Sequence, residues 1–281
     1  MKLTLSLLLI ILAILFGCTG MNDELSRAVS RGDIAKMKEL LKRGADKNKK
    51  GKYGDTPLMI SVIHRKYEIA NFLIRNGADL NIKNDSGYTA LITAVSTGDP
   101  GFAELLLKAG ALVDARNHDG DTAIMFVGSG LLSYKRRIEN DAAFRNGMYD
   151  ILKKRKITTG EMILDNTKRL VNILVSFGAD INAKSDNGTT ALMRAASSED
   201  CNPALISYMV EKGAKINIRN VKGQTPLTYA VSSGSIACAK VLIKKGADVH
   251  VVDKDNKFLV DIAEERIDKP MVDLLRRANA Y

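Results

Sequence analysis

The stretch Gly77–Val95, GADLNIKNDSGYTALITAV, contains the two markers that decide the fold. The first marker is the triplet Gly-Ala-Asp, which begins at Gly44, Gly77, Gly178 and Gly246, with near-copies that begin at Gly110 and Gly213. These six glycines are 33, 33, 68, 35 and 33 residues apart. The second marker is a threonine two residues before Leu or Ile, and it recurs in phase at Thr56, Thr89, Thr122, Thr190 and Thr225. Two markers in phase predict an internal repeat.

Each marker has a physical reason. A tight turn needs a positive φ, which glycine adopts cheaply, and a glycine stands two residues before every marker threonine: Gly54, Gly87, Gly120, Gly188 and Gly223. The last repeat has Asn256 instead. The threonine is predicted to cap a first helix, and a second helix follows, as at 68–75 and 236–244. Asp99, Asn202 and Ser235 are its expected N-caps, and the Gly-Ala-Asp glycine ends it in a left-handed cap.

The period and the Thr-Pro-Leu motif resemble the ankyrin repeat. The resemblance covers the chain from about residue 22 to its end. It implies an all-α solenoid of helix-turn-helix repeats with projecting β-turn fingers, about seven repeats including caps within 24–281. It also implies a protein that binds other proteins. The histidine of the family motif is replaced in every repeat, so apolar packing is expected instead at Met59, Ile92, Met125 and Met193, with Thr228 in the fifth repeat.

The 68-residue interval predicts an insertion of about 131–166. One undetected degenerate repeat is the alternative, but no glycine turn falls in phase inside it. Thr158-Thr159-Gly160-Glu161 reads as a capping box, so the second helix of this repeat is expected to begin near Thr159. Residues 131–142 have the spacing of a helical first arm. The basic run Lys153–Lys156 is interpreted as solvated charge, with a lipid or partner contact as the alternative.

The N-terminal segment resembles a bacterial lipoprotein signal. Leu3–Phe16 is too short to span a bilayer, and Leu15-Phe16-Gly17-Cys18 is similar to the lipobox, although Phe16 replaces a small residue. The expected organisation is a signal peptide at 1–17, a lipidated Cys18 and a short tether at 18–23 before a helix near Glu24. Ordinary cleavage beside an incidental cysteine is the alternative. Thr19 favours the outer membrane, on its periplasmic side or at the cell surface.

The sequence offers little for catalysis, and we expect neither an enzyme nor a cofactor. His64, His118 and His250 lack metal-ligand spacing, and neither a phosphate-binding loop nor a nucleophile elbow occurs. Cys201 and Cys238 occupy different places in their repeats and are expected to be buried free thiols. The net charge of +10 without a binding motif does not indicate nucleic acid. A monomer is favoured. The alternatives are an envelope spacer and an enzyme or regulator with its site in the insertion.

The candidate binding surface is a row of basic residues six positions after the helix-ending glycines. This basic ladder consists of Lys50, Lys83, Arg116, Lys184 and Arg219, and Val252 ends it. It either docks an acidic protein partner or pairs locally with Asp85, Asp119 and Asp186. Further candidates on the fingers and first helices are Tyr53, His64, Tyr88, His118 and Asn187.

Overall fold

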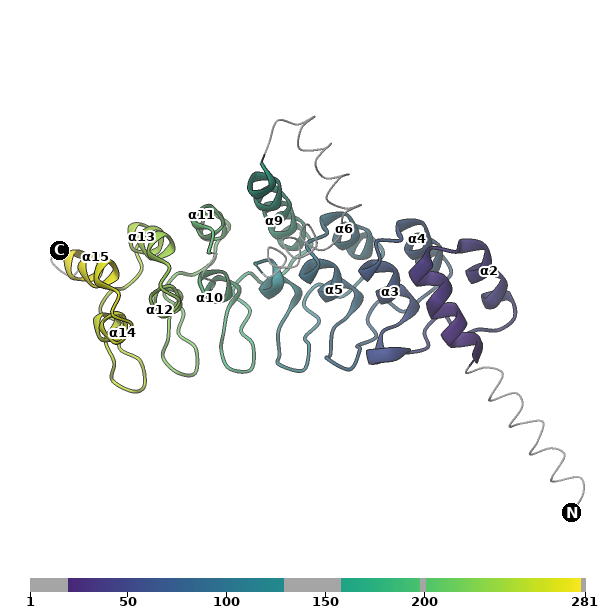
Figure 1. Ribbon diagram of the computed structural model, residues 1–281, viewed down its shortest axis with the longest axis horizontal. Coiled ribbons are helices and arrows are strands. Elements are labelled where there is room, and N and C mark those ends of the chain that lie inside the picture. Colours follow the sequence, from purple (N-terminus) through teal and green to yellow (C-terminus); the bar gives the residue numbers. More distant parts are fainter. Residues whose placement is uncertain (1–19, 129–157, 198–200, 279–281) are drawn as a thin grey trace, which may run out of the picture. The chain divides into compact units, whose positions relative to one another are not determined.

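A computed structural model describes residues 20–128, 158–197 and 201–278 (Figure 1). The predicted signal peptide, Cys18, the first arm of the insertion and the run Lys153–Lys156 lie outside the described residues. The chain divides into two compact units. The N-terminal unit is 1–94 with 104–112, and the C-terminal unit is 95–103 with 113–281.

The helices occur in pairs along the chain, as the repeat predicts. In the N-terminal unit, residues 20–31 are helical and are followed by α2 (Ile34–Lys42), the 3-10 helix η1 (Lys52–Gly54), α3 (Pro57–Ile63) and α4 (Tyr67–Arg75). The helices α5 (Ala90–Ser96) and α6 (Pro100–Lys108) contribute residues to both units. The C-terminal unit continues with η2 (Ala123–Phe126), α9 (Thr159–Ser176), α10 (Ala191–Ala196), α11 (Pro203–Glu211), α12 (Pro226–Ser232), α13 (Ile236–Lys244), α14 (Leu259–Glu265) and α15 (Lys269–Ala278).

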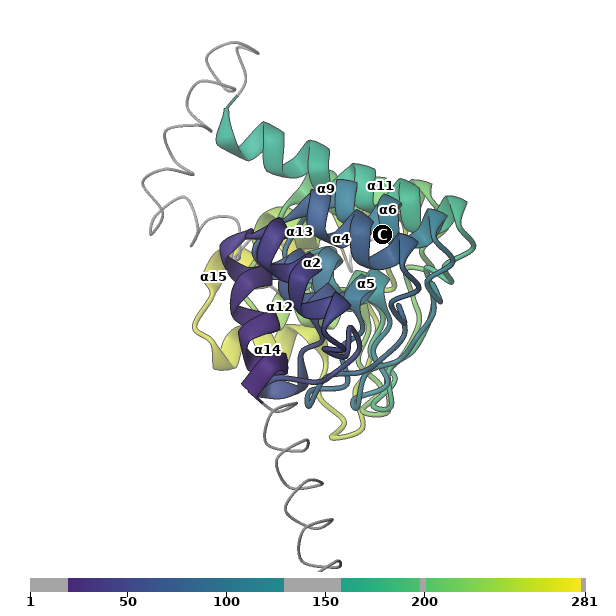
Figure 2. The ribbon, with the colours of Figure 1, turned by 90° about the vertical axis from the view of Figure 1, so that its right-hand side faces the viewer.

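This all-helical architecture is the predicted fold class. The described ranges contain no β-strand, and Val252 and Phe258 form an isolated antiparallel bridge. Within each unit the turn fingers project from the same side of the helices (Figure 1 and Figure 2). The predicted second helices are confirmed at α4 and α13. The first described helix is already present at residue 20, earlier than the predicted start near Glu24.

Local backbone chemistry explains where the helices begin. Gly54 has φ 72°, and a Cβ there would collide with Asp85, so only glycine fits this turn. Asn256 replaces the glycine in the last repeat with φ 58°. The Thr56 hydroxyl accepts a hydrogen bond from the Met59 backbone N–H at 3.3 Å, which is the expected cap.

Two predicted caps are wrong. The Thr122 side chain does not cap its helix, and its Oγ1 atom is buried without a hydrogen-bond partner among the described residues. A short 3-10 helix, η2, follows it in place of the α-helix of the other repeats. Ser235 stands at the start of α13 but makes no side-chain cap. The predicted caps at Asp99 and Asn202 are confirmed, because both side chains accept hydrogen bonds from backbone N–H groups of the helices they precede.

The core lies between the two helices of each repeat and between successive repeats. In the C-terminal unit α10, α12 and α14 pack in series, and α11, α13 and α15 form a second series. The residues that replace the family histidine are buried, with exposed fractions of 2 % or less at Met59, Ile92, Met125 and Met193. Apolar packing therefore substitutes at these four positions, as predicted. Thr228 instead caps α12 together with Thr225.

The helix α9 has 18 residues, against nine in α4, α11 and α13. It begins at the predicted capping box: the Thr158 side chain accepts from the Glu161 N–H, and the Glu161 carboxylate accepts from the Thr158 N–H at 2.8 Å. Its added turns carry the buried side chains of Met162 and Ile163. Residues 159–166, which were assigned to the insertion, are therefore part of the packed helix.

Candidate functional site

A series of asparagines that the sequence analysis did not single out joins neighbouring repeats. Each stands four residues after a helix-ending glycine, and its Oδ1 atom accepts a hydrogen bond from a backbone N–H of the next repeat. The bonds are Asn48 to Asp79 N at 2.9 Å, Asn81 to Leu112 N at 3.0 Å, Asn182 to Lys215 N at 2.7 Å and Asn217 to Asp248 N at 2.9 Å. The recurrent Asn in the pattern Gly-Ala-x-x-Asn was the signal that could have found them.

Asp114 takes the place of this asparagine before the long repeat. Its two carboxylate oxygens lie 3.4 Å from the Asp180 backbone N. Partial desolvation of the Asp114 carboxylate, an exposed group, raises its pKa; the hydrogen bond from the Asp180 backbone opposes this, and the negative charge of Asp180 adds to the increase. A carboxylate also lacks the N–H₂ group that Asn182 and Asn217 donate to the carbonyls of Gly213 and Gly246.

The basic ladder has a defined geometry in the C-terminal unit. Arg116 donates to the Lys184 carbonyl at 3.1 Å, Lys184 reaches the Arg219 carbonyl at 3.4 Å, and Arg219 donates to the Val252 carbonyl at 3.0 Å. Each ladder side chain thus contacts the backbone of the next ladder residue. Val252, the last position of the row, accepts the final bond through its backbone carbonyl.

The ladder is also partly neutralised. The Arg116 guanidinium lies 2.8 Å from the Asp186 carboxylate of the following repeat, with side-chain exposures of 47 % and 68 %. The predicted alternative of pairing with nearby aspartates is therefore seen at Asp186, but across repeats. All three ladder side chains of this unit belong to exposed residues, and an exposed ion pair contributes little to stability.

The other candidate residues are not part of this row. In the N-terminal unit Lys50 and Lys83 are exposed and make no hydrogen bond or ion pair with a described residue. Tyr53 is 67 % exposed with φ 64°, and the Lys52 Nζ atom lies 4.7 Å from its ring centroid. His64 is the exposed C-cap of α3, and Tyr88 is half-buried with its N–H bound to the Asn84 side chain. In the C-terminal unit His118 and Asn187 are exposed on fingers.

An ion pair between a buried carboxylate, directly before the marker Thr122, and an arginine of α10 was not predicted. The Asp121 carboxylate has a side-chain exposure of 3 %, and the Arg194 Nη2 atom donates to its two oxygens at 2.7 and 2.6 Å. The Arg194 guanidinium carbon also lies 5.6 Å from the Phe126 ring centroid. A buried carboxylate requires such a partner. This contact secures α10 to the finger of the preceding repeat, so we assign it to packing rather than to a ligand site.

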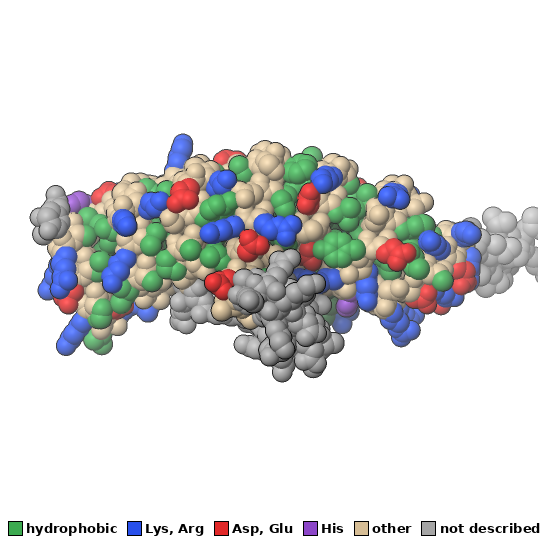
Figure 3. All heavy atoms as spheres, turned by 90° about the horizontal axis from the view of Figure 1, so that it is seen from above, with side chains coloured by type: hydrophobic (Ala, Val, Ile, Leu, Met, Phe, Trp, Pro, Cys, Tyr) green, Lys and Arg blue, Asp and Glu red, His purple; other side chains and the backbone are tan. Residues whose placement is uncertain are grey.

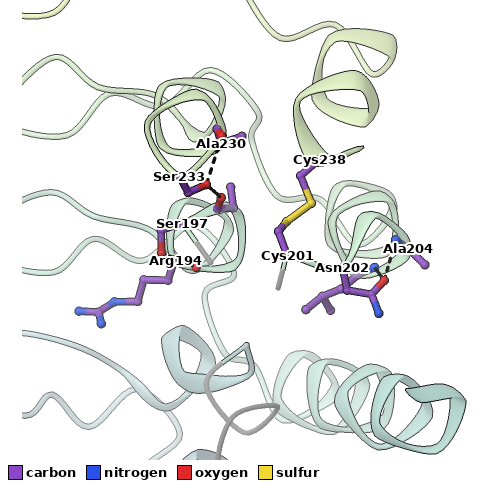
Figure 4. Close-up of a disulfide and its surroundings, with 10 residues drawn as sticks. Arg194, Ser197, Cys201, Asn202, Ala204, Ala230, Ser233 and Cys238 are labelled. Atoms are coloured by element: carbon purple, nitrogen blue, oxygen red, sulfur yellow. Dashed lines mark hydrogen bonds between the residues drawn. A yellow bond between two sulfur atoms is a disulfide. The ribbon is translucent and has the colours of Figure 1, made fainter. Parts of the chain in front are cut away.

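Cys201 and Cys238 form a disulfide, so the expectation of free thiols is wrong (Figure 4). Cys201 lies just before α11, and Cys238 lies in the first turn of α13. These two helices are neighbours, so their N-terminal ends bring the Cα atoms to 6.3 Å although the positions in the repeat differ. That distance is within the range that a disulfide can bridge.

Across the described residues we find neither a cluster of three or more His, Cys, Asp or Glu side chains suited to a metal ion nor a helix long and apolar enough to cross a membrane. Figure 3 views the second helices from outside and shows basic side chains interspersed with acidic and hydrophobic ones.

A family model described as "Ankyrin repeats (3 copies)" matches residues 25–127 and 161–253. The chain is an ankyrin-repeat protein. Ankyrin repeats are protein-interaction scaffolds, which makes a protein the expected class of partner. The fold of this ankyrin-repeat protein is also similar to solved structures. It shares 22% identity and a TM-score of 0.64 with the ankyrin repeat domain of Bcl-3, described as a unique member of the IkappaB protein family, with 90% of this chain and 97% of that chain covered.

The human ASB11 ankyrin repeat domain gives 18% identity and a TM-score of 0.65, with 89% of this chain and 96% of that chain covered. At these identities the likeness concerns the fold alone. No curated protein matches the chain significantly.

Proposed function

We propose that this ankyrin-repeat protein is a lipid-anchored adaptor of the bacterial envelope that binds an acidic protein partner through its fingers and first helices. The family supports the class of partner. The anchor rests on the sequence before residue 20, and the compartment rests on that sequence together with the disulfide between Cys201 and Cys238.

The observation that carries the binding proposal is the ordered row Arg116, Lys184 and Arg219. Their bonds to successive carbonyls hold the cationic groups in place before a partner arrives. An arginine has five N–H donors, and the contacts described here use only some of them. Ordering the side chains in advance lowers the entropy cost of binding, and a carboxylate-bearing partner matches both the charge and the geometry of the guanidinium groups.

Two observations support export with a lipid on Cys18. Leu15-Phe16-Gly17-Cys18 is similar to the lipobox and follows an apolar segment. The disulfide between Cys201 and Cys238 is of a kind that forms and persists in oxidising compartments. Together they favour a protein that folds outside the cytoplasm and stays attached to a membrane.

The binding proposal is tested with charge reversals on the ladder. Partners are captured from an envelope fraction with the wild-type protein, and association rates are then measured with Lys184→Glu/Arg219→Glu and with the control Lys240→Glu/Lys244→Glu on α13. Because exposed charges act mainly on the association rate, the ladder variant should bind more slowly, and the effect should shrink as salt increases. Equal rates for the two variants would overturn the proposal. Circular dichroism verifies that both remain folded.

The anchor is tested separately at Cys18. Metabolic labelling with a fatty acid should mark the wild type but not Cys18→Ser, and the variant should leave the membrane fraction or accumulate unprocessed. An unlabelled wild-type protein would overturn the anchor and leave the binding proposal intact.

A further inference from the structure

The first repeat contains the densest basic segment among the described residues. Residues 42–53 include six cationic side chains and one acidic one, Asp46: the cationic residues are Lys42, Arg43, Lys47, Lys49, Lys50 and Lys52. Arg43 pairs with Glu39, and Lys52 lies over the Tyr53 ring. The other four lysines have no ion pair with a described residue. This basic loop is therefore available for an external anion.

The structure places the basic loop beside the start of the described chain. The Asn22 Oδ1 atom accepts a hydrogen bond from the Asp46 backbone N–H at 2.9 Å. Asn22 and Asp23 also line a small cavity of about 70 Å³ together with Lys49 and Lys50. Asn22 is four residue steps from Cys18, a span of at most about 14 Å. A lipid on Cys18 would thus hold these lysines close to the bilayer.

A second cavity extends the basic loop between α2 and α4. It has a volume of about 700 Å³, and its walls include Lys38, Lys42 and Lys47 around the apolar side chains of Leu41 and Phe72. The Lys38 Nζ atom lies 5.0 Å from the Phe72 ring centroid. The Asp46 carboxylate, which also lines the cavity, accepts a hydrogen bond from the Asn48 N–H. Ammonium groups around an apolar floor suit a phosphate that carries a glycerol and acyl chain.

Tyr53 adds an amphipathic side chain at the end of the same segment. It is 67 % exposed on the first finger and is held with a positive φ. Tyrosine is enriched at the level of lipid headgroups, where its ring meets the apolar side and its hydroxyl meets water. An exposed tyrosine beside unpaired lysines is the composition expected of a surface that touches a membrane.

We propose that the basic loop, residues 42–53, and the adjoining cavity form a membrane-facing surface that binds anionic phospholipid headgroups. Its role is to orient the domain, because a lipid on Cys18 fixes only the distance from the bilayer. The orientation argument rests on the proposed lipid anchor. Binding of the headgroups themselves does not, and it can be measured without the lipid.

The test uses the full chain with Cys18→Ser and vesicles of phosphatidylglycerol and phosphatidylethanolamine in equal amounts. Co-sedimentation is compared with that on phosphatidylcholine vesicles. Removing three lysines with Lys42→Gln/Lys47→Gln/Lys50→Gln should weaken partitioning onto the anionic vesicles by roughly 100-fold, because each basic residue near an anionic surface contributes about fivefold. The matched control, Lys215→Gln/Lys240→Gln/Lys244→Gln, removes the same charge from exposed positions of the C-terminal unit and should retain most of the binding.

The outcomes separate the two proposals. Equal losses in the two triple variants, or no preference of the parent chain for anionic vesicles, would overturn the membrane-facing surface. Capture of an acidic protein through these lysines in the absence of vesicle binding would likewise overturn it. If wild-type Cys18 carries a fatty-acid label but the protein does not bind vesicles, the lipid anchor is supported and the membrane-facing surface is refuted. If the basic loop binds vesicles but Cys18 carries no label, the membrane-facing surface is supported and the lipid anchor is refuted. Thermal unfolding monitored by circular dichroism confirms that the variants are folded.

Discussion

Single asparagines join successive repeats, and the position where one is replaced is the most informative residue of the series. Asn182 both accepts from the Lys215 N–H and donates to the Gly213 carbonyl, so one side chain satisfies two backbone groups of the next repeat. Asp114 can only accept, and it does so at 3.4 Å. This weak junction spans the repeat that carries the insertion, because Asp114 precedes η2 and Asp180 follows α9.

We predict that Asp114→Asn stabilises the protein. The new amide gains a donor, and a typical hydrogen bond contributes about 1 kcal/mol, which corresponds to a rise in Tm of about 2–4 °C for a protein of this size. Because the folded-state pKa of Asp114 is raised, its charge costs stability at neutral pH, and this cost disappears as the pH falls through that pKa. Denaturant unfolding should therefore show a larger gain at pH 7 than in acid. The reverse change, Asn182→Asp, should destabilise, and a stabilising effect would contradict the explanation.

Helix ends determine how the long repeat is built. The helix α9 begins at a reciprocal pair of bonds between Thr158 and Glu161, about two and a half turns ahead of where a nine-residue helix would start. The hydrogen bonds from the Thr158 backbone and side chain lower the pKa of Glu161. The capping box is therefore made by the ionised carboxylate.

We predict that the start of α9 frays in acid. A carboxylate with a depressed folded-state pKa contributes stability above its unfolded pKa, and that contribution is lost as the pH falls through the folded value. Amide hydrogen exchange at residues 161–163 should accelerate below the ordinary glutamate range in the wild type, after correction for intrinsic rates. Glu161→Gln should show faster exchange already at neutral pH and a weaker pH dependence. Identical profiles for the two proteins would rule out the box as the cause.

The disulfide joins the segment just before α11 to the first turn of α13. It closes a loop with a sequence separation of 37, for which the chain-entropy model gives a stabilisation of about 4 kcal/mol. In the Cys18→Ser background, reductant should lower the Tm of the protein, whereas the Tm of the Cys201→Ser/Cys238→Ala variant should not change. The Cys238 side chain is fully buried, and alanine avoids burying a hydroxyl there. Two alkylatable thiols in the denatured, unreduced parent would contradict the bond.

At the scale of the whole molecule, stability is distributed over repeats that pack on their immediate neighbours. The contacts within the C-terminal unit run in series along α10, α12 and α14 and along α11, α13 and α15. In such proteins the total stability approximates a sum of repeat and interface contributions. Damage to one repeat is then expected to remain local.

We predict that Leu73→Ala, in the N-terminal unit, unfolds mainly its own region. Leu73 on α4 is fully buried, so its truncation should cost about 2–5 kcal/mol. Hydrogen-exchange protection should fall in α3 and α4 and persist in α12 to α15. The matched variant Leu242→Ala, on α13, should show the reverse pattern. Loss of protection throughout the chain in either variant would show that the protein unfolds as one cooperative block.

The sequence by itself determined the period, the helix pairs and most helix ends. These features depend on atoms a few residues apart: a positive φ at Gly54, a hydroxyl at Thr56 that caps its own helix, and a reciprocal pair at Thr158 and Glu161. Local backbone requirements select particular residue types at fixed spacings, so these features can be predicted from the sequence alone. The same periodicity aligned the basic ladder, but it did not reveal what the ladder contacts.

Only the tertiary structure decided the contacts between repeats. Arg116 and Lys184 are 68 residues apart in the sequence, Arg194 and Asp121 are 73 apart, and Cys201 and Cys238 are 37 apart. None of these separations equals the repeat period, because the insertion lengthens two of them and the two cysteines occupy different places in their repeats. When the repeats stack, the packing of helix against helix brings these residues into contact despite their unequal separations in the sequence. That is why the disulfide and the carbonyl-bound ladder emerge only once the repeats are assembled.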